Sequence, residues 1–190
     1  MRRPMQRLGI VVVLVSLALL DVACSSAGST QASSAAPAPW GLVSKRYDFR
    51  VTLTKAWDAV DAVADWDGKA LESIDAPDFA KFTNATTGRT LMAAAAPIGA
   101  GTNLGTWRTA MVSALPSGCS NAKSASRTSL DGEPAMTWPA FCTDGLTVES
   151  VTALHGGRGY IVLLASPTGG GAAADHTVFE SIRRSFRFGL

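Results

Sequence analysis

The first part of the chain constrains the fold most, because it removes a long apolar stretch from the residues that can form a core. Three arginines open the chain, and an apolar run from Leu8 to Leu20 follows them. This run falls within the roughly 7–15 residues of a signal-peptide core and is shorter than the ~20 that span a bilayer. We therefore predict that residues 1–23 are a signal peptide and that the rest of the chain is exported.

The end of this leader resembles that of a bacterial lipoprotein. Small residues precede Cys24, as a lipoprotein signal peptidase requires. The resemblance implies that Cys24 is lipidated, and that acyl chains hold the protein on the extracytoplasmic face of the cell membrane. Asp21 stands where such leaders normally have an aliphatic residue. Cleavage without lipidation and an uncleaved anchor therefore remain alternatives.

The next segment is a linker. Residues 24–39 contain no aromatic, large aliphatic or charged side chain. Such a segment cannot bury a core, and as a random coil it spans roughly 20–25 Å. We predict a flexible tether over residues 24–39 and a single folded domain over residues 40–190, which is long enough to bury one core.

The charge of the domain argues against nucleic acid as a partner. The full chain has 17 basic and 15 acidic residues. Removing the leader takes away three arginines and Asp21, which leaves 14 of each. Because the mature domain is neutral, it offers no basic field to a polyanion.

The cysteines indicate a disulfide. If Cys24 carries lipid, Cys119 and Cys142 remain, and two thiols outside the cytoplasm usually pair. The bridge would close a loop worth roughly 3 kcal/mol on the chain-entropy model. Free thiols are the alternative. A zinc site would need further ligands, but the chain has no CxxC or HxxxH motif, so we expect no metal.

The first half of the domain predicts two strands and one helix. Apolar and polar residues alternate from Tyr47 to Thr54, which is the period of a half-buried strand. Helical spacing between Lys55 and Trp66 predicts either a helix or an irregular crossing. Arg89 to Ile98 is predicted as a strand, although its alanines suit a helix equally well. Residues 102–115 carry an apolar stripe at helical spacing.

The second half predicts three consecutive strands. These runs extend from Pro134 to Cys142, from Leu146 to His155 and from Tyr160 to Ser166. Short glycine-containing turns separate them, which is typical of an antiparallel meander.

A last helix follows, and we expect Asp175 to cap its N-terminus. Four apolar residues line one face of this helix: Val178, Phe179, Ile182 and Phe186. Three arginines are expected to remain outside: Arg183, Arg184 and Arg187. The order of elements predicts the α+β class, with helices packed on an antiparallel sheet.

Several segments together resemble the PsbP-like bacterial lipoproteins, which share a fold with DcrB and LpqN proteins. The segments are YDFRVTL, DWDGKALESIDAPDF, LDGEPA, HGGRGYIVLLASP and FESIRRSFRF, in this order between Tyr47 and Phe188. The resemblance implies a PsbP-like sandwich. It also implies a non-enzymatic accessory or binding module without a cofactor.

We find no catalytic constellation in the sequence. A serine hydrolase needs a nucleophile, a base and an orienting acid, but the chain has no GxSxG elbow, and its only histidines are His155 and His176. We interpret both as structural or solvated residues. The acidic segment around Asp65 to Gly68 does not fit the spacing of an EF-hand, and we interpret it as a solvated face.

The tryptophans suggest where a ligand would bind. Most of the five should be core anchors, but exposed ones beside the acidic segment would line a ligand groove, with Trp66 and Trp107 as the candidates. The leading hypothesis is a membrane-anchored, non-enzymatic module that binds an envelope protein or a small apolar ligand. A purely structural or assembly subunit is the alternative, and a hydrolase with an unrecognised site is a remote third.

Overall fold

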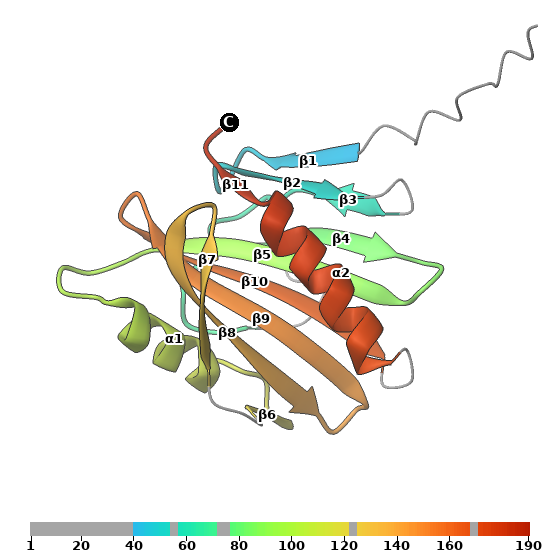
Figure 1. The fold of residues 1–190 in the computed structure, drawn as a ribbon. Coiled ribbons are helices and arrows are strands. Elements are labelled where there is room, and N and C mark those ends of the chain that lie inside the picture. Colours follow the sequence, from blue (N-terminus) through green and yellow to red (C-terminus); the bar gives the residue numbers. More distant parts are fainter. Residues whose placement is uncertain (1–39, 54–56, 72–76, 122–124, 168–170) are drawn as a thin grey trace, which may run out of the picture. The chain divides into compact units, whose positions relative to one another are not determined.

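The structure is a computed structural model that describes residues 40–53, 57–71, 77–121, 125–167 and 171–190 (Figure 1). The predicted signal peptide, the lipidation site Cys24 and the tether over 24–39 lie outside the described residues. In the described ranges, no helix is long and apolar enough to cross a membrane.

The described residues form two antiparallel sheets and two helices. The larger sheet contains β3 (Asp58–Val60), β4 (Ala80–Asn84), β5 (Arg89–Pro97), β10 (Arg158–Pro167), β9 (Leu146–His155), β8 (Glu133–Cys142) and β6 (Cys119–Asn121) in that spatial order, with β7 (Ser126–Leu130) also paired to β8. The smaller sheet contains β1 (Trp40–Ser44), β2 (Phe49–Leu53) and β11 (Arg187–Phe188). The helices are α1 (Leu104–Ser113) and α2 (Ala172–Ser185).

This architecture confirms the predicted fold class. The meander of β8, β9 and β10 is present, with antiparallel pairing throughout. The alanine-rich segment is strand β5, which pairs with β10 over almost its whole length and buries its alanines. The predicted helix over residues 102–115 is α1, which begins at a capping box formed by Asn103 and Thr106.

The two helices cover opposite faces of the larger sheet. Arg89 on β5 contacts Asp175 of α2. Gly159 lies directly beneath Trp107 of α1 and pairs with Ala96 on β5. Because side chains alternate across a strand, Arg89 and Ala96 point to opposite sides. We therefore distinguish an α1 face and an α2 face.

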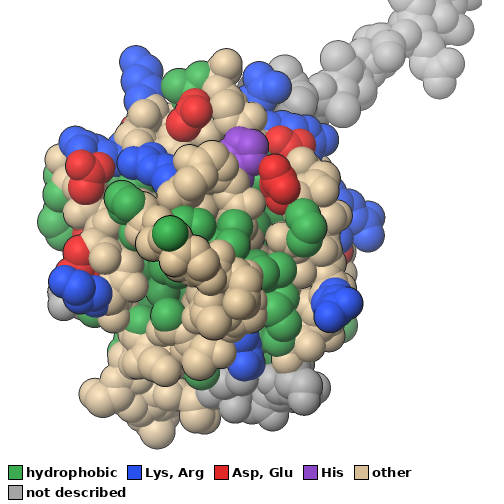
Figure 2. All heavy atoms as spheres, turned by 90° about the vertical axis from the view of Figure 1, so that its left-hand side faces the viewer, with side chains coloured by type: hydrophobic (Ala, Val, Ile, Leu, Met, Phe, Trp, Pro, Cys, Tyr) green, Lys and Arg blue, Asp and Glu red, His purple; other side chains and the backbone are tan. Residues whose placement is uncertain are grey.

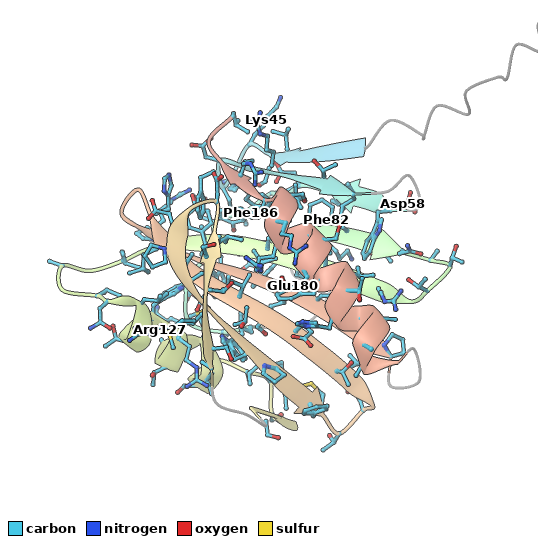
Figure 3. All side chains as sticks on the ribbon, in the orientation of Figure 1. Lys45, Asp58, Phe82, Arg127, Glu180 and Phe186 are labelled. Atoms are coloured by element: carbon cyan, nitrogen blue, oxygen red, sulfur yellow. A yellow bond between two sulfur atoms is a disulfide. The ribbon has the colours of Figure 1, made fainter. Side chains whose placement is uncertain are left out.

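Helix α2 closes its face of the sheet. Phe179 and Ile182 are almost completely buried, as is Phe186 immediately after the helix (Figure 3). The Phe186 ring stacks on Phe49 of β2 with the ring centroids 5.0 Å apart. The helix therefore joins the two sheets through one apolar core.

Two predictions about α2 were wrong. Gly171 occupies the N-cap position, and Asp175 lies inside the first turn, where its carboxylate accepts hydrogen bonds from Arg89 at 2.7 and 2.8 Å. Arg183 does not remain outside. Its guanidinium forms two hydrogen bonds with Glu180 and a third with the Ser129 carbonyl oxygen, which holds it against the protein.

The segment after β2 forms no helix where the structure describes it. The helical alternative for Lys55 to Trp66 was wrong, because residues 58–60 form strand β3 and the chain then bends irregularly. Trp57 and Trp66 are buried, whereas Val60 between them is 59% exposed. The spacing of apolar residues suggested one helical face, but they do not share one environment. Thr54 and Lys55, at the start of this segment, lie outside the described residues.

Charges of both signs are mixed on the surface. On the face shown in Figure 2, Lys and Arg side chains alternate with Asp and Glu around the periphery, and hydrophobic side chains are visible between them. This face shows no continuous basic field, in agreement with the neutral charge of the domain.

Candidate functional site

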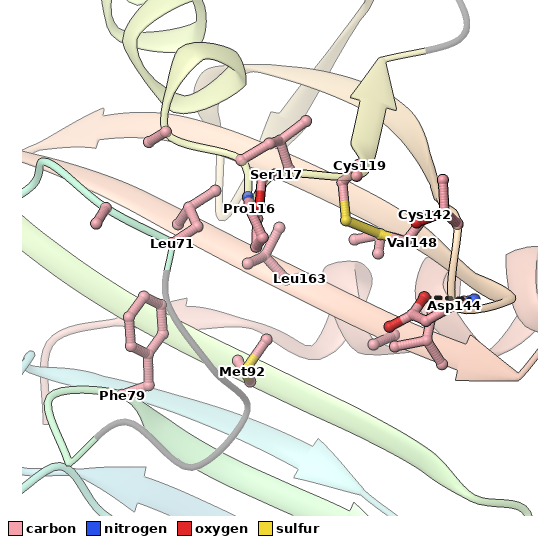
Figure 4. Close-up of a pocket in the computed structure, with 17 residues that line it drawn as sticks. Leu71, Phe79, Met92, Pro116, Ser117, Cys119, Cys142, Asp144, Val148 and Leu163 are labelled. Carbon is pink, nitrogen blue, oxygen red and sulfur yellow. Dashed lines mark hydrogen bonds between the residues drawn. A yellow bond between two sulfur atoms is a disulfide. The ribbon is translucent and has the colours of Figure 1, made fainter.

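An apolar pocket of about 1000 Å³ lies on the α1 face of the larger sheet (Figure 4). Its floor consists of side chains from three neighbouring strands. Met92 of β5 is paired in register with Leu163 of β10, and Ala165 is paired with Val148 of β9. Because paired residues share a face, these four side chains form a continuous apolar surface.

The wall of the pocket comes from the segment that follows α1. Residues 114–119 turn back over the sheet and contribute Leu115 and Pro116 to the lining. The Ala114 carbonyl oxygen accepts a 2.9 Å hydrogen bond from the Leu71 amide, which fixes a second part of the wall. Phe79 completes this side of the lining.

A disulfide closes one end of the pocket. Cys119 on β6 is bonded to Cys142 on β8, as the sequence predicted, and both cysteines line the pocket. Beside them, the Thr143 amide donates a 2.9 Å hydrogen bond to the Gly118 carbonyl. Gly118 has φ +94°, and a Cβ there would lie 2.8 Å from the Thr143 hydroxyl oxygen. A glycine is therefore required to bring this loop so close to the β8–β9 turn.

The polar groups of the pocket lie at this same end. Ser117, Thr143 and Asp144 line it there, and the Asp144 carboxylate accepts a hydrogen bond from the Leu146 amide. The rest of the lining is apolar. This distribution suits a ligand with an apolar body and one polar end, because burial of apolar surface supplies affinity and a few polar groups fix orientation.

The two tryptophans suggested by the sequence lie in the core and do not line this pocket. Trp66 and Trp107 are 2% and 6% exposed and meet edge to face at a centroid distance of 6.0 Å. Each indole N–H donates to a backbone carbonyl, that of Ala70 for Trp66 and that of Tyr160 for Trp107. Trp66 also packs against Phe79, so it supports the pocket wall from behind.

A buried tyrosine holds the irregular segment that carries Trp66. The Tyr47 hydroxyl donates to the Asp78 carbonyl and accepts a 3.0 Å hydrogen bond from the Trp66 amide. Burial raises the pKa of Tyr47 to about 12, so the phenol stays protonated in neutral solution. The Tyr160 hydroxyl donates a 2.9 Å hydrogen bond to the Tyr47 carbonyl oxygen, which connects Tyr47 to β10.

Neither histidine lies in a catalytic arrangement. His155 Nδ1 is 2.9 Å from a Glu133 carboxylate oxygen, and its ring stacks on Phe188 with the centroids 4.2 Å apart. His176 is mostly exposed and lies 3.7 Å from Glu149. These histidine contacts include no serine or cysteine. Burial raises the pKa of Glu149, and the attraction of His176 only partly offsets this effect.

The carboxylates of Asp61 and Asp65 contact residues of the turn after β1. Asp61 accepts hydrogen bonds from the Ser44 hydroxyl and the Lys45 amide, and Asp65 forms an ion pair with Arg46. Within the described part of the chain, no three His, Cys, Asp or Glu side chains gather closely enough to hold a metal ion.

Solved structures share this arrangement of strands and helices. The solution structure of cyanobacterial PsbP (CyanoP) from Synechocystis sp. PCC 6803 matches with a TM-score of 0.55 at 13% identity, over 82% of this chain and 95% of that chain. The fold is PsbP-like. A crystal structure from Bacteroides thetaiotaomicron VPI-5482 matches with a TM-score of 0.52 at 13% identity, over 80% of this chain and 49% of that chain.

A third structure is that of LpqN, which is involved in cell envelope biogenesis of Mycobacterium tuberculosis. It has 12% identity and a TM-score of 0.49, over 83% of this chain and 88% of that chain. No family model matches the sequence, and no curated protein sequence matches it. The likeness to the first two structures confirms the predicted fold, and at their sequence identities it shows the fold alone.

No motif in the sequence points directly to the pocket. Its lining comes from six separated parts of the chain, and the floor consists of apolar residues such as Met92, Leu163 and Ala165, which sequence alone does not distinguish from other core residues. Only the prediction of the disulfide placed two lining residues near each other. The pocket depends on the register of β5, β10 and β9 and on the path of residues 114–119.

Proposed function

We propose that this protein is an extracytoplasmic accessory module that is anchored through a lipid on Cys24 and binds a small apolar ligand in the pocket beside the disulfide. The observation that carries the proposal is the pocket itself. About 1000 Å³ lined mostly by apolar side chains is at the upper end of the range for small-molecule sites. The pocket has polar groups at one end, and its described lining includes no histidine.

The leader and the disulfide support export. The apolar run before Cys24 has the length of a signal-peptide core, and small residues precede the cysteine. A disulfide such as Cys119–Cys142 is typical of proteins in oxidising compartments and rare in the cytosol. The intact mass of the membrane-extracted protein tests the anchor. We expect a mass equal to that of residues 24–190 plus acyl chains. A mass without acyl chains would contradict it.

A fluorescent probe titration tests ligand binding. Val148 is half-buried in the pocket floor, so Val148→Trp should fill much of the pocket while the strand keeps its pairing. Nile red is the probe, because its emission rises in apolar surroundings. We expect the full-length protein to bind it saturably and Val148→Trp to weaken binding at least about ten-fold, which corresponds to ~1.4 kcal/mol.

Thr147→Trp is the matched control. Thr147 is the adjacent residue on β9, is also half-buried and points to the other face of the sheet. Its tryptophan should leave probe affinity within about two-fold of the parent. Equal affinity in the parent and Val148→Trp would contradict the pocket as the binding site, and an equal loss in both variants would point to general destabilisation.

A further inference from the structure

Two buried polar side chains on the α1 face have no hydrogen-bond partner in the described structure. They are Ser150 on β9 and Trp138 on β8, and both are 0% exposed. Neither the Ser150 hydroxyl nor the Trp138 indole N–H is bonded. An unpartnered polar group in a core lowers stability, because it has lost its hydrogen bonds to water. Packing alone therefore does not explain these two groups.

The strand register places both groups beside the pocket floor. Ser150 is paired with Trp138 on one side and with Leu163 on the other, so the three side chains share the α1 face. Leu163 lines the pocket, and so does Val148, which lies two residues before Ser150 on the same face of β9. Ser150 is therefore the direct neighbour of two lining residues, and Trp138 is the next residue across the sheet.

The polar residues at the disulfide end of the pocket offer a ligand less. Ser117, Thr143 and Asp144 are exposed, so a ligand there only exchanges one hydrogen bond with water for another. The Asp144 carboxylate also repels an acceptor oxygen. Ser150 lies four residues beyond Leu146 on β9, about 13 Å along the strand from that end. A ligand oxygen gains more at this inner end, because the groups there are already removed from water.

The chemistry of the two unpartnered groups defines what they bind. The Trp138 indole N–H can only donate a hydrogen bond, and the Ser150 hydroxyl can donate as well. A carbonyl or carboxylate oxygen has two lone pairs and can accept from both. An acyl chain carries such an oxygen at one end of an apolar body, and the pocket floor beside Ser150 is apolar.

We propose that the pocket binds an acyl chain whose carbonyl or carboxylate oxygen accepts hydrogen bonds from Ser150 and Trp138. This inference rests on the proposed ligand pocket and names its ligand class. Both donors are covered in this structure, so the ligand shifts the protein toward a state in which the pocket extends past Leu163 to Ser150. The two new hydrogen bonds favour that state, because they satisfy groups that otherwise have no partner.

Indole NMR of the full-length protein with ¹⁵N-labelled tryptophan tests the contact. Dodecanoate and methyl dodecanoate are the ligands, and we expect the Trp138 N–H signal to shift saturably with the one that binds more tightly. Comparison of the two affinities shows whether the acyl group is a free acid or an ester. A shift of the Met92 methyl signal without a shift of Trp138 would overturn this proposal and keep the pocket. No shift of either signal would contradict the pocket itself.

Ser150→Ala separates binding from stability. The variant removes an unpartnered hydroxyl, so its urea unfolding midpoint should equal or exceed that of the parent. Its affinity for the tighter acyl ligand should fall about five-fold, which is the loss expected for one hydrogen bond.

Ser166→Ala is the matched control. Ser166 is also buried and unpartnered, but it follows the lining residue Ala165 on β10 and therefore points to the α2 face. The control should keep the affinity of the parent. Parental affinity in Ser150→Ala, or equal losses in both variants, would overturn the proposal.

Discussion

The two faces of the larger sheet differ in how completely they are covered. On the α2 face, Phe179 and Ile182 insert into the core, and the pair of Arg89 and Asp175 fixes the start of the helix. On the α1 face, Trp107 and Met111 bury one end of the sheet. The segment after α1 then turns away and leaves the apolar pocket.

This difference separates stability from binding. A face filled by side chains adds to the free energy of unfolding, because its apolar area is removed from water. A face with a pocket retains apolar surface that a ligand can cover. We therefore expect substitutions on the α2 face to change stability and substitutions in the pocket to change ligand affinity.

The largest effect is expected from Phe179→Ala on the α2 face. The side chain is fully buried, and its truncation leaves a cavity that lowers the free energy of unfolding by about 3–5 kcal/mol. Urea unfolding measures this loss. Nile red affinity of the folded variant should remain within about two-fold of the parent.

The control is Leu115→Ala on the pocket wall. Leu115 is only half-buried, so we expect Leu115→Ala to lower the free energy of unfolding by about 1 kcal/mol or less. Because Leu115 lines the pocket, the same substitution should weaken nile red binding. If Phe179→Ala weakened nile red binding as much as Leu115→Ala does, the two faces would not be independent.

The disulfide should affect both properties. Cys119→Ser/Cys142→Ser removes a bridge between residues 23 positions apart, and the chain-entropy model predicts a loss of roughly 3 kcal/mol in urea unfolding. Because both cysteines line the pocket, nile red affinity should fall as well. Unchanged affinity would show that the disulfide stabilises the fold without shaping the pocket.

The smallest effect concerns Glu149, which faces α2. Burial raises its pKa in the folded state, so between the ordinary value of 4.5 and the raised value the folded state binds the proton more tightly than the unfolded chain. Stability therefore falls as the pH rises through this window. Glu149→Gln should remove this fall in the free energy of unfolding with rising pH. Urea unfolding of parent and variant at several pH values measures the difference. Parallel curves for parent and variant would contradict the raised pKa.

Much of the fold could be predicted from the sequence where one physical signal dominated. Short glycine turns separate β8, β9 and β10, of which β9 and β10 carry several β-branched residues, and α1 has a clear apolar stripe. Local spacing failed between Trp57 and Trp66, because those residues are held by distant partners. The Tyr47 hydroxyl, from the turn between β1 and β2, accepts a hydrogen bond from the Trp66 amide, and no local pattern encodes that contact.

The candidate site was less predictable. The disulfide followed from the number of cysteines and from export, and Cys119 and Cys142 do line the pocket. Trp66 and Trp107 were candidates for a ligand groove because large aromatic residues often bind ligands. Their indole N–H groups instead donate to backbone carbonyls inside the core. The pocket depends on cross-strand neighbours such as Met92 and Leu163, which are distant in sequence.

Methionine methyl NMR tests the central claim most directly. Met92 lines the pocket, whereas Met111 is buried in α1 and Met136 lies on β8, and neither of these two lines it. In a titration of the ¹³C-methyl-methionine protein with dodecanoate, we expect the Met92 signal to shift saturably while Met111 and Met136 stay in place. An unchanged Met92 signal, or equal shifts of all three, would contradict an apolar ligand site in this pocket.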